Sequence, residues 1–151
     1  MTPLVRRAAA SDIEEIATIH REAFPRQRDS EAWVKATLSA VPRILTFVLA
    51  LDSSVAGYIF WAQKSGIRPS VVLELDQVAI VSQFRRQGYG ERLIRESLAL
   101  VAAELKGNGQ SLRSVLVSTR ADNDAQSLYA RILGAKVVAS MHRNPHFTLL
   151  L

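Results

Sequence analysis

Apolar and polar positions along the chain follow helix and strand periodicities in turn, and their order predicts the fold. Helices are predicted at 11–23, 29–41, 88–106 and 122–133, where apolar residues recur every three or four positions. Strands are predicted at 4–7, 44–51, 55–63, 71–81, 112–119, 135–140 and 147–151, where apolar residues alternate with polar ones or run together. This order predicts an α/β fold, in which a mixed sheet of about six to seven strands has helices on both faces.

The first two helices carry recognisable end signals. Ser11 and Glu14 have the spacing of a capping box, with the serine at the N-cap and the glutamate three residues later. Pro42 ends the second helix, whose predicted inner stripe consists of Trp33, Ala36, Thr37 and Ala40. No repeat or low-complexity segment divides the chain, so its 151 residues are expected to form a single domain, 1–151.

The most informative local unit is a strand, a loop with glycines and a helix, which together span residues 76–107. A polar, basic loop at 82–87 follows the strand, and Gly88 and Gly90 open the helix. The first N–H groups of a helix lack intrahelical partners and carry partial positive charge, and glycines let a ligand approach them. This arrangement predicts a seat for a phosphate or pyrophosphate. On the loop alone, a basic surface turn is the simpler interpretation.

The wider pattern around this loop favours the phosphate seat. The loop reads Arg85-Arg86-Gln87-Gly88-Tyr89-Gly90, which resembles the Arg/Gln-x-x-Gly-x-Gly/Ala motif of the GNAT superfamily of N-acetyltransferases. The order of elements is similar to that family too, and so is Arg120-Ala121-Asp122-Asn123 ahead of a helix that ends at Leu133-Gly134. The resemblance implies a GNAT-like fold and acetyl-coenzyme A as co-substrate.

The resemblance also implies which residues meet the cofactor. The pyrophosphate would bind Arg85, Arg86, Gln87, Gly88, Tyr89 and Gly90, and the pantetheine arm would pair with the backbone of Val78, Ala79 and Ile80. Asn123 matches the family's asparagine that helps to hold the cofactor. Asn123 could instead serve as a helix N-cap, as could Asp122.

Glu74 and Asp76 are two carboxylates in a strand that is otherwise mostly apolar. By strict alternation both would share a face with Val78 and Ile80. A buried carboxylate is costly unless it is paired or hydrated, so a polar cavity is expected there. The resemblance implies a general base on this strand, with Glu74 slightly favoured over Asp76. The alternative is that one of them pairs with a nearby arginine or lies at an exposed strand end.

Tyr129 is the candidate for the general acid that protonates the leaving thiolate. In the family, a tyrosine follows the asparagine by seven residues, and that position here is Ala130. Because one residue turns a helix by about 100°, this shift predicts a different direction for the Tyr129 side chain. Counting from Asp122 restores the spacing. A core tyrosine without a catalytic role is the alternative.

Composition narrows the chemistry. The chain has no cysteine, which excludes a disulfide framework and a cysteine nucleophile, and its three scattered histidines predict no metal site. The net charge of +5 comes from 19 basic and 14 acidic residues. Since no aromatic residues interleave with a basic stripe, a polyphosphate cofactor explains the arginines near the loop better than nucleic acid does. No apolar run of about 18 residues is present, so no membrane span is expected. The N-terminal residues 1–7 have no apolar segment of the kind found in a secretory signal, so none is expected.

These observations predict an acetyl-CoA-dependent N-acetyltransferase that acetylates a primary amine of a small molecule or protein by direct attack. The alternatives are a catalytically weak CoA-binding or sensory module of the same fold, and a basic nucleic-acid-binding domain. The expected partners are acetyl-CoA and an amine acceptor, without nucleic acid or membrane. The acceptor pocket is expected to involve residues 24–30 and 66–70, which carry no recognisable motif. A cytoplasmic location is expected, and a homodimer is left open.

Overall fold

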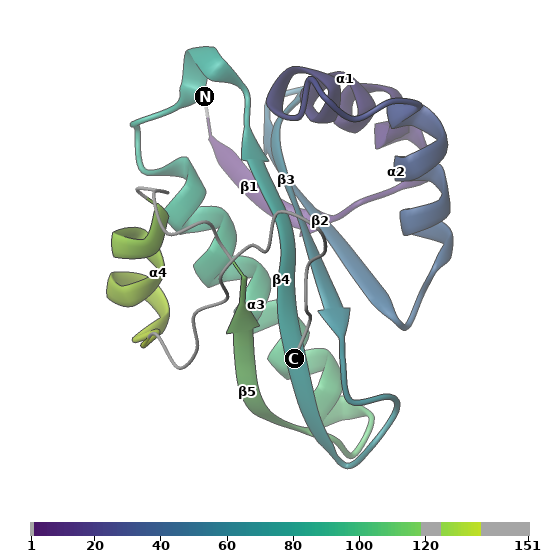
Figure 1. Ribbon diagram of the computed structural model, residues 1–151, viewed down its shortest axis with the longest axis vertical. Helices are drawn as coiled ribbons and strands as arrows, with labels where there is room; N and C mark the ends of the chain where they lie inside the picture. Colours follow the sequence, from purple (N-terminus) through teal and green to yellow (C-terminus); the bar gives the residue numbers. More distant parts are fainter. Residues whose placement is uncertain (1, 119–124, 137–151) are drawn as a thin grey trace, which may run out of the picture.

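The computed structural model describes residues 2–118 and 125–136, which form a five-stranded mixed sheet between two helical layers (Figure 1). The strands, in their order across the sheet, are β1 Pro3–Arg7, β2 Ile44–Leu51, β3 Ser54–Gln63, β4 Ser70–Ile80 and β5 Ser111–Val117. Neighbouring strands are antiparallel except β4 and β5, which are parallel. The helices are α1 Ile13–Ala23, α2 Ser30–Ser39, α3 Tyr89–Gly107 and α4 Ala125–Leu133, with 3₁₀ turns at Ala10–Asp12 and Ser82–Phe84.

The predicted mixed α/β fold is confirmed, and the elements predicted within the described residues are present with small displacements of their ends. The described sheet has five strands, fewer than the expected number of about six to seven. Of the strand predicted at 135–140, only residues 135 and 136 are described, and they are not in a strand. The strand predicted at 147–151 lies outside the described residues.

The sheet separates two apolar cores. The helices α1 and α2 cover one face, and α3 and α4 cover the other (Figure 1). Because successive side chains of a strand point to opposite faces, β3 sends Phe60 to the α1 side and its neighbour Trp61 to the α3 side. Both side chains are fully buried. The indole nitrogen of Trp61 donates a hydrogen bond to Ser97 Oγ of α3 at 2.8 Å, which fixes α3 on the sheet.

The buried face of α2 differs from the predicted stripe. Trp33 is 47% exposed, whereas Val34 is fully buried beside Ile16 in the core beneath α1 and α2. The inner positions are Ser30, Val34 and Thr37, which fall at the i, i+4 and i+7 spacing of one helical face. Of the predicted stripe, Thr37 is buried, whereas Trp33 and Ala36 are exposed, because α2 packs on its neighbours through the Ser30, Val34 and Thr37 side.

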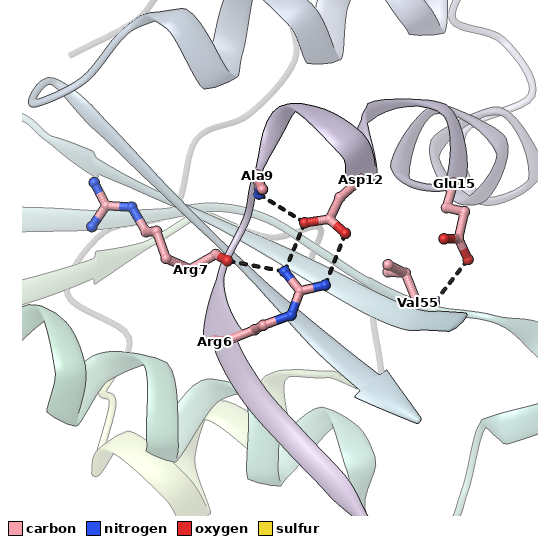
Figure 2. A network of polar contacts seen from close by, with 6 residues as sticks. All are labelled: Arg6, Arg7, Ala9, Asp12, Glu15 and Val55. Carbon is pink, nitrogen blue, oxygen red and sulfur yellow. Dashed lines mark hydrogen bonds and ion pairs between the residues drawn. The ribbon is translucent and has the colours of Figure 1, made fainter. Parts of the chain in front are cut away.

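A partly buried ion pair fixes the start of α1 (Figure 2). Asp12 is 4% exposed, and its two carboxylate oxygens accept hydrogen bonds from the guanidinium group of Arg6 at 2.7 and 2.9 Å. The same carboxylate also accepts the Ala9 N–H at 2.7 Å. The Arg6 guanidinium is the main cause that holds the pKa of Asp12 below its usual range. The cap predicted at Ser11 is therefore wrong, because Asp12 satisfies the entering backbone and also has a charged partner.

Candidate functional site

The loop between β4 and α3 contains two residues with a left-handed backbone conformation. Gly88 is the N-cap of α3 and has φ of +81°, a left-handed value at which a side chain would be strained. Arg86 also has a positive φ, of +59°. Within the loop, Arg85 Nε donates to the Ile80 carbonyl oxygen at 2.9 Å, and Gln87 Nε2 donates to the Gln83 carbonyl oxygen at 3.1 Å. The first bond holds the loop against the end of β4, and the second ties the loop to the preceding 3₁₀ turn Ser82–Phe84.

The loop presents a row of free backbone donors. Within the described part of the chain, the N–H groups of residues 86–91 donate no hydrogen bond, and the first helical bond runs from the Arg92 N–H to the Gly88 carbonyl at 3.1 Å. A Cβ atom placed on Gly88 would meet no atom within 4 Å, so the space beside this turn is open. Free N–H groups at a helix N-terminus, beside the exposed side chains of Arg85 and Arg86, are an arrangement that suits an anion.

The edge of β4 that leads to this loop is open as well. The parallel ladder between β4 and β5 ends with Leu75 opposite Val117, while β4 continues to Ile80. Within the described residues, the segment 76–80 therefore has β3 on one side and no strand on the other. An extended ligand could pair with this edge as an added strand. The backbone of Val78, Ala79 and Ile80 and the loop donors thus form one continuous path.

A β-bulge interrupts β4 at Asp76. Phe60 of β3 lies opposite Gln77, and the next residue, Trp61, lies opposite Leu75. Asp76 is therefore an extra residue with no partner on β3, which is the definition of a bulge. A bulge changes the alternation of side chains along its strand, so residues before and after it do not keep the faces that a period of two predicts.

The bulge overturns the prediction that Glu74 and Asp76 share a face with Val78 and Ile80. Leu75 and Val78 are an odd number of residues apart, yet both pack in the core beneath α3, together with Ile80. Glu74 lies on the opposite face of β4, on the side of α1 and α2, because it neighbours Leu75 in the regular part of the strand. The prediction failed because the extra residue, Asp76, reverses which face of the sheet the side chains after it point to.

The two carboxylates have different surroundings. Glu74 Oε2 lies 3.7 Å from Lys64 Nζ in an ion pair, and this side chain is largely covered. Asp76 is exposed, although burial by the surrounding protein raises the pKa of its carboxyl group, and the negative charge of Glu74 raises this pKa further. Lys64 opposes that shift. Asp76 therefore combines access from solvent with a carboxyl group whose pKa is shifted toward neutral pH.

Two polar residues next to this pair were not singled out by the sequence. Tyr58 of β3 is fully buried, and its hydroxyl group donates to Gln77 Oε1 at 3.3 Å. Burial raises the pKa of the Tyr58 phenol, and the charge of Asp76 adds to the shift. The only signal in the sequence was a glutamine beside Asp76 in an apolar strand. The partner that makes this glutamine informative lies on another strand.

Tyr129 lies on the side of the sheet that carries the loop. Its side chain is 9% exposed in the core shared with α3, and burial raises the pKa of its phenol. Arg131 of α4 pairs with Glu91 in the first turn of α3 at 2.9 Å, which holds α4 near the loop end of that helix. Asn123, the other residue predicted in this region, lies outside the described residues.

A cavity of about 380 Å³ lies at the other end of α3. Its lining includes Leu45, Gln63, Ile67 and Glu104, together with the turn at Asn108. The N–H groups of residues 86–91 are at the N-terminus of α3 and this cavity is at its C-terminus, so the cavity is separate from the loop between β4 and α3. No helix among the described residues is long and apolar enough to cross a membrane. The described residues also contain no cluster of three His, Cys, Asp or Glu side chains that could hold a metal ion.

Proteins of known structure share the fold of this chain at low sequence identity. The aminoglycoside N-acetyltransferase AAC(6')-Iy, in complex with the bisubstrate analog CoA-S-monomethyl-acetylneamine, is 19% identical with a TM-score of 0.70, and the match covers 95% of this chain and 100% of that one. A possible acetyltransferase from Clostridium difficile 630 is 16% identical with a TM-score of 0.74, covering 95% and 97%. A ribosomal-protein-alanine N-acetyltransferase from Brucella melitensis biovar Abortus 2308 is 17% identical with a TM-score of 0.71, covering 95% and 98%.

The family follows from a direct match to the sequence. No curated relative matches the chain significantly. The model of the acetyltransferase (GNAT) family matches residues 13–135, which is most of the chain and includes the loop, the bulged strand and Tyr129. The chain therefore belongs to the acetyltransferase (GNAT) family, and the acetyl-CoA-dependent N-acetyltransferase predicted from its sequence is confirmed at the level of that family.

Proposed function

We propose that this protein acetylates a primary amine of a small molecule or protein, with Asp76 as the general base and Tyr129 as the general acid. The observation that carries the proposal is the row of N–H groups at residues 86–91, which donate no hydrogen bond within the described residues and follow the segment of β4 that has no described strand beyond it. That row suits a pyrophosphate, and the edge suits the extended pantetheine arm that follows it. The thioester of acetyl-CoA supplies the activated acetyl group.

Asp76 is a better candidate for the base than Glu74, which the sequence slightly favoured. An alkylamine is protonated at neutral pH and must lose a proton before it can attack a carbonyl carbon. A carboxylate with a raised pKa accepts that proton more readily than an ordinary one, and the carboxyl group of Asp76 has such a pKa. Glu74 is instead engaged with Lys64. Asp76 also lies at the bulge, directly ahead of the open backbone of 78–80.

The β4 backbone would stabilise the oxyanion, and Tyr129 would protonate the leaving thiolate. When the amine nitrogen bonds to the acetyl carbon, negative charge develops on the carbonyl oxygen, and N–H groups of the open β4 edge would stabilise it. The carbon–sulfur bond then breaks, and the thiolate takes a proton from the Tyr129 hydroxyl group. Burial keeps this phenol protonated at neutral pH, so it is available as a donor.

The acceptor is proposed only as a primary amine. Two proteins of the same fold are an aminoglycoside N-acetyltransferase and a ribosomal-protein-alanine N-acetyltransferase, so this fold is compatible with small-molecule and with protein amines. A cytoplasmic location, which the absence of cysteine favours, and a homodimer remain predictions.

An acceptor screen tests the proposal. The protein would be incubated with acetyl-CoA and, in turn, an aminoglycoside, a polyamine, free amino acids, a lysine peptide and a peptide with N-terminal alanine, while release of CoA thiol is followed. Transfer to at least one amine is expected, with binding of acetyl-CoA seen by calorimetry. Tight acetyl-CoA binding without transfer to any amine would favour the alternative, a CoA-binding or sensory module.

A further inference from the structure

We propose that Tyr58 of β3 and Gln77 of β4 form a positioning pair, which fixes the β4 bulge and holds the Asp76 carboxyl group in its working place. The inference rests on the proposed function, in which Asp76 is the base. Neither residue belongs to the cofactor path. The pair would act through Asp76, so neither member is expected to touch the reacting atoms.

The first support is the geometry across the two strands. The Tyr58 hydroxyl donates to Gln77 Oε1 at 3.3 Å, which is longer than an ideal O–H···O bond. Ala79 lies directly opposite Tyr58, so Gln77 is its diagonal neighbour on the same face of the sheet. The ring of Phe60, opposite Gln77, lies 4.8 Å from the Tyr58 ring between centroids. The pair therefore links the residue that follows the bulge to the strand across from it.

The second support is that the pair lies beside the bulge and that a buried phenol needs a hydrogen-bond partner. The backbone ladder is locally disrupted at Asp76, which has no partner on β3. Side-chain contacts next to the bulge can then add to the backbone pairs that flank it. Tyr58 is fully buried, and a buried hydroxyl group without a hydrogen bond is costly. Gln77 supplies the acceptor for the Tyr58 hydroxyl group, directly beside the point where the backbone ladder is interrupted.

The third support is the charge that Tyr58 and Asp76 exert on each other. The Asp76 charge adds to the raised pKa of the Tyr58 phenol, which places the two groups within electrostatic range. Glu74 on the same strand and Lys64 just after β3 also face Asp76 and shift its pKa in opposite directions. Removing the phenol hydroxyl or the amide would leave the Asp76 carboxylate in less polar surroundings. The pKa of Asp76 should then rise further.

The test follows the Asp76 carboxyl group directly, so it does not depend on the identity of the acceptor. The ¹³C carboxyl signal of Asp76, assigned by its loss in Asp76→Asn, would be titrated in the wild type, Tyr58→Phe, Gln77→Met and the double variant. Both single variants should move the midpoint to higher pH. The double variant should match either single one, because the pair acts as a unit.

A control variant and steady-state kinetics distinguish an effect on the position of Asp76 from a general loss of protein stability. Val48 lies opposite Tyr58 in the same core, and Val48→Ala should lower the melting temperature without moving the Asp76 midpoint. With an accepted amine, Tyr58→Phe and Gln77→Met should lower kcat/KM by about two- to tenfold, the usual range for one hydrogen bond. Acetyl-CoA affinity should not change. Gln77 is only half-buried, so if Tyr58→Phe fails to fold, Gln77→Met still reports the Asp76 midpoint.

Two results would overturn the inference. One is an unchanged Asp76 midpoint in the single variants while the melting temperature falls, as in Val48→Ala. The other is a double variant whose shift equals the sum of the single shifts, since the two residues would then act independently. The proposed function fails separately, if Asp76→Asn keeps wild-type turnover, and the titration would still decide the role of the pair.

Discussion

Substitution of Gly88 tests the proposed pyrophosphate-binding loop directly, because Gly88 sets the backbone conformation of that loop. It has φ of +81°, and a Cβ at this position would meet no atom within 4 Å. A valine side chain would therefore clash with nothing in the protein, and its effect would come from backbone strain. A residue with a Cβ in the left-handed region costs roughly 1–2 kcal/mol, and valine lies at the upper end because it is β-branched.

The Gly88→Val variant can respond to this strain in two ways. If the loop keeps its conformation, stability falls by roughly the strain energy of 1–2 kcal/mol. If the loop relaxes, the N–H groups of 86–91 no longer converge, and acetyl-CoA affinity falls by about 5- to 30-fold for the same free energy. The valine side chain would also occupy the space that the pyrophosphate needs. The expected result is therefore a folded protein with strongly reduced affinity.

Gly90 is the matched control. It lies in the first turn of α3 without a positive φ, and a Cβ there would meet only Ile80 Cγ1, at 3.9 Å. Gly90→Ala should keep most of the affinity and add up to about 1 kcal/mol of stability, since alanine is the better helix former. Calorimetry with acetyl-CoA and thermal unfolding measure both quantities. Wild-type affinity in a folded Gly88→Val protein would refute the proposed seat.

Three further predictions concern the acid, the base and the start of α1. Tyr129→Phe should lower kcat by about 10²-fold or more with acetyl-CoA affinity unchanged; near-normal turnover would remove this tyrosine from the chemistry. Because the pKa of Asp76 is raised, kcat/KM should rise with pH through this group, and Asp76→Asn should abolish that limb while Glu74→Gln slows turnover less. If both variants keep the wild-type pH profile, neither carboxylate is the base. Asp12→Asn should cost about 1–3 kcal/mol at pH 7, at the lower part of what a buried pair loses because the Arg6 side chain is 38% exposed. The pKa of Asp12 is depressed in the fold, so this stability is present above the unfolded value of about 3.9 and is lost as pH falls through the folded pKa. Ser11→Ala is its control in urea unfolding; an equal loss of stability in both variants would contradict the assignment of the cap to Asp12.

The sequence by itself determined the elements and the cofactor loop. Helix and strand periodicities depend on neighbours in the chain, so β2, β3 and α3 were found where they were predicted. The loop motif is equally local: Gly88 occupies a left-handed position, which a glycine tolerates better than other residues. The order of elements, together with this motif, was sufficient for the family, which the family model confirms.

Only the tertiary structure decided the details of the candidate catalytic face. The bulge at Asp76 exists only in relation to β3, since it is the pairing of Phe60 with Gln77 and of Trp61 with Leu75 that leaves one residue over. Strict alternation therefore placed Glu74 on the wrong face. The Tyr58 partner of Gln77 was likewise invisible, because it lies on another strand.

The same reason explains the other failed predictions. Asp12 took the place expected for Ser11 because Arg6, from β1, folds back onto it (Figure 2). The helix α2 buries Val34 and not Trp33, because its docking on the sheet fixes its rotation. Local periodicity determines which residues form a helix or strand. Which side chains meet across elements depends on register, bulges and helix rotation, and these are set by packing between segments that are far apart in the sequence.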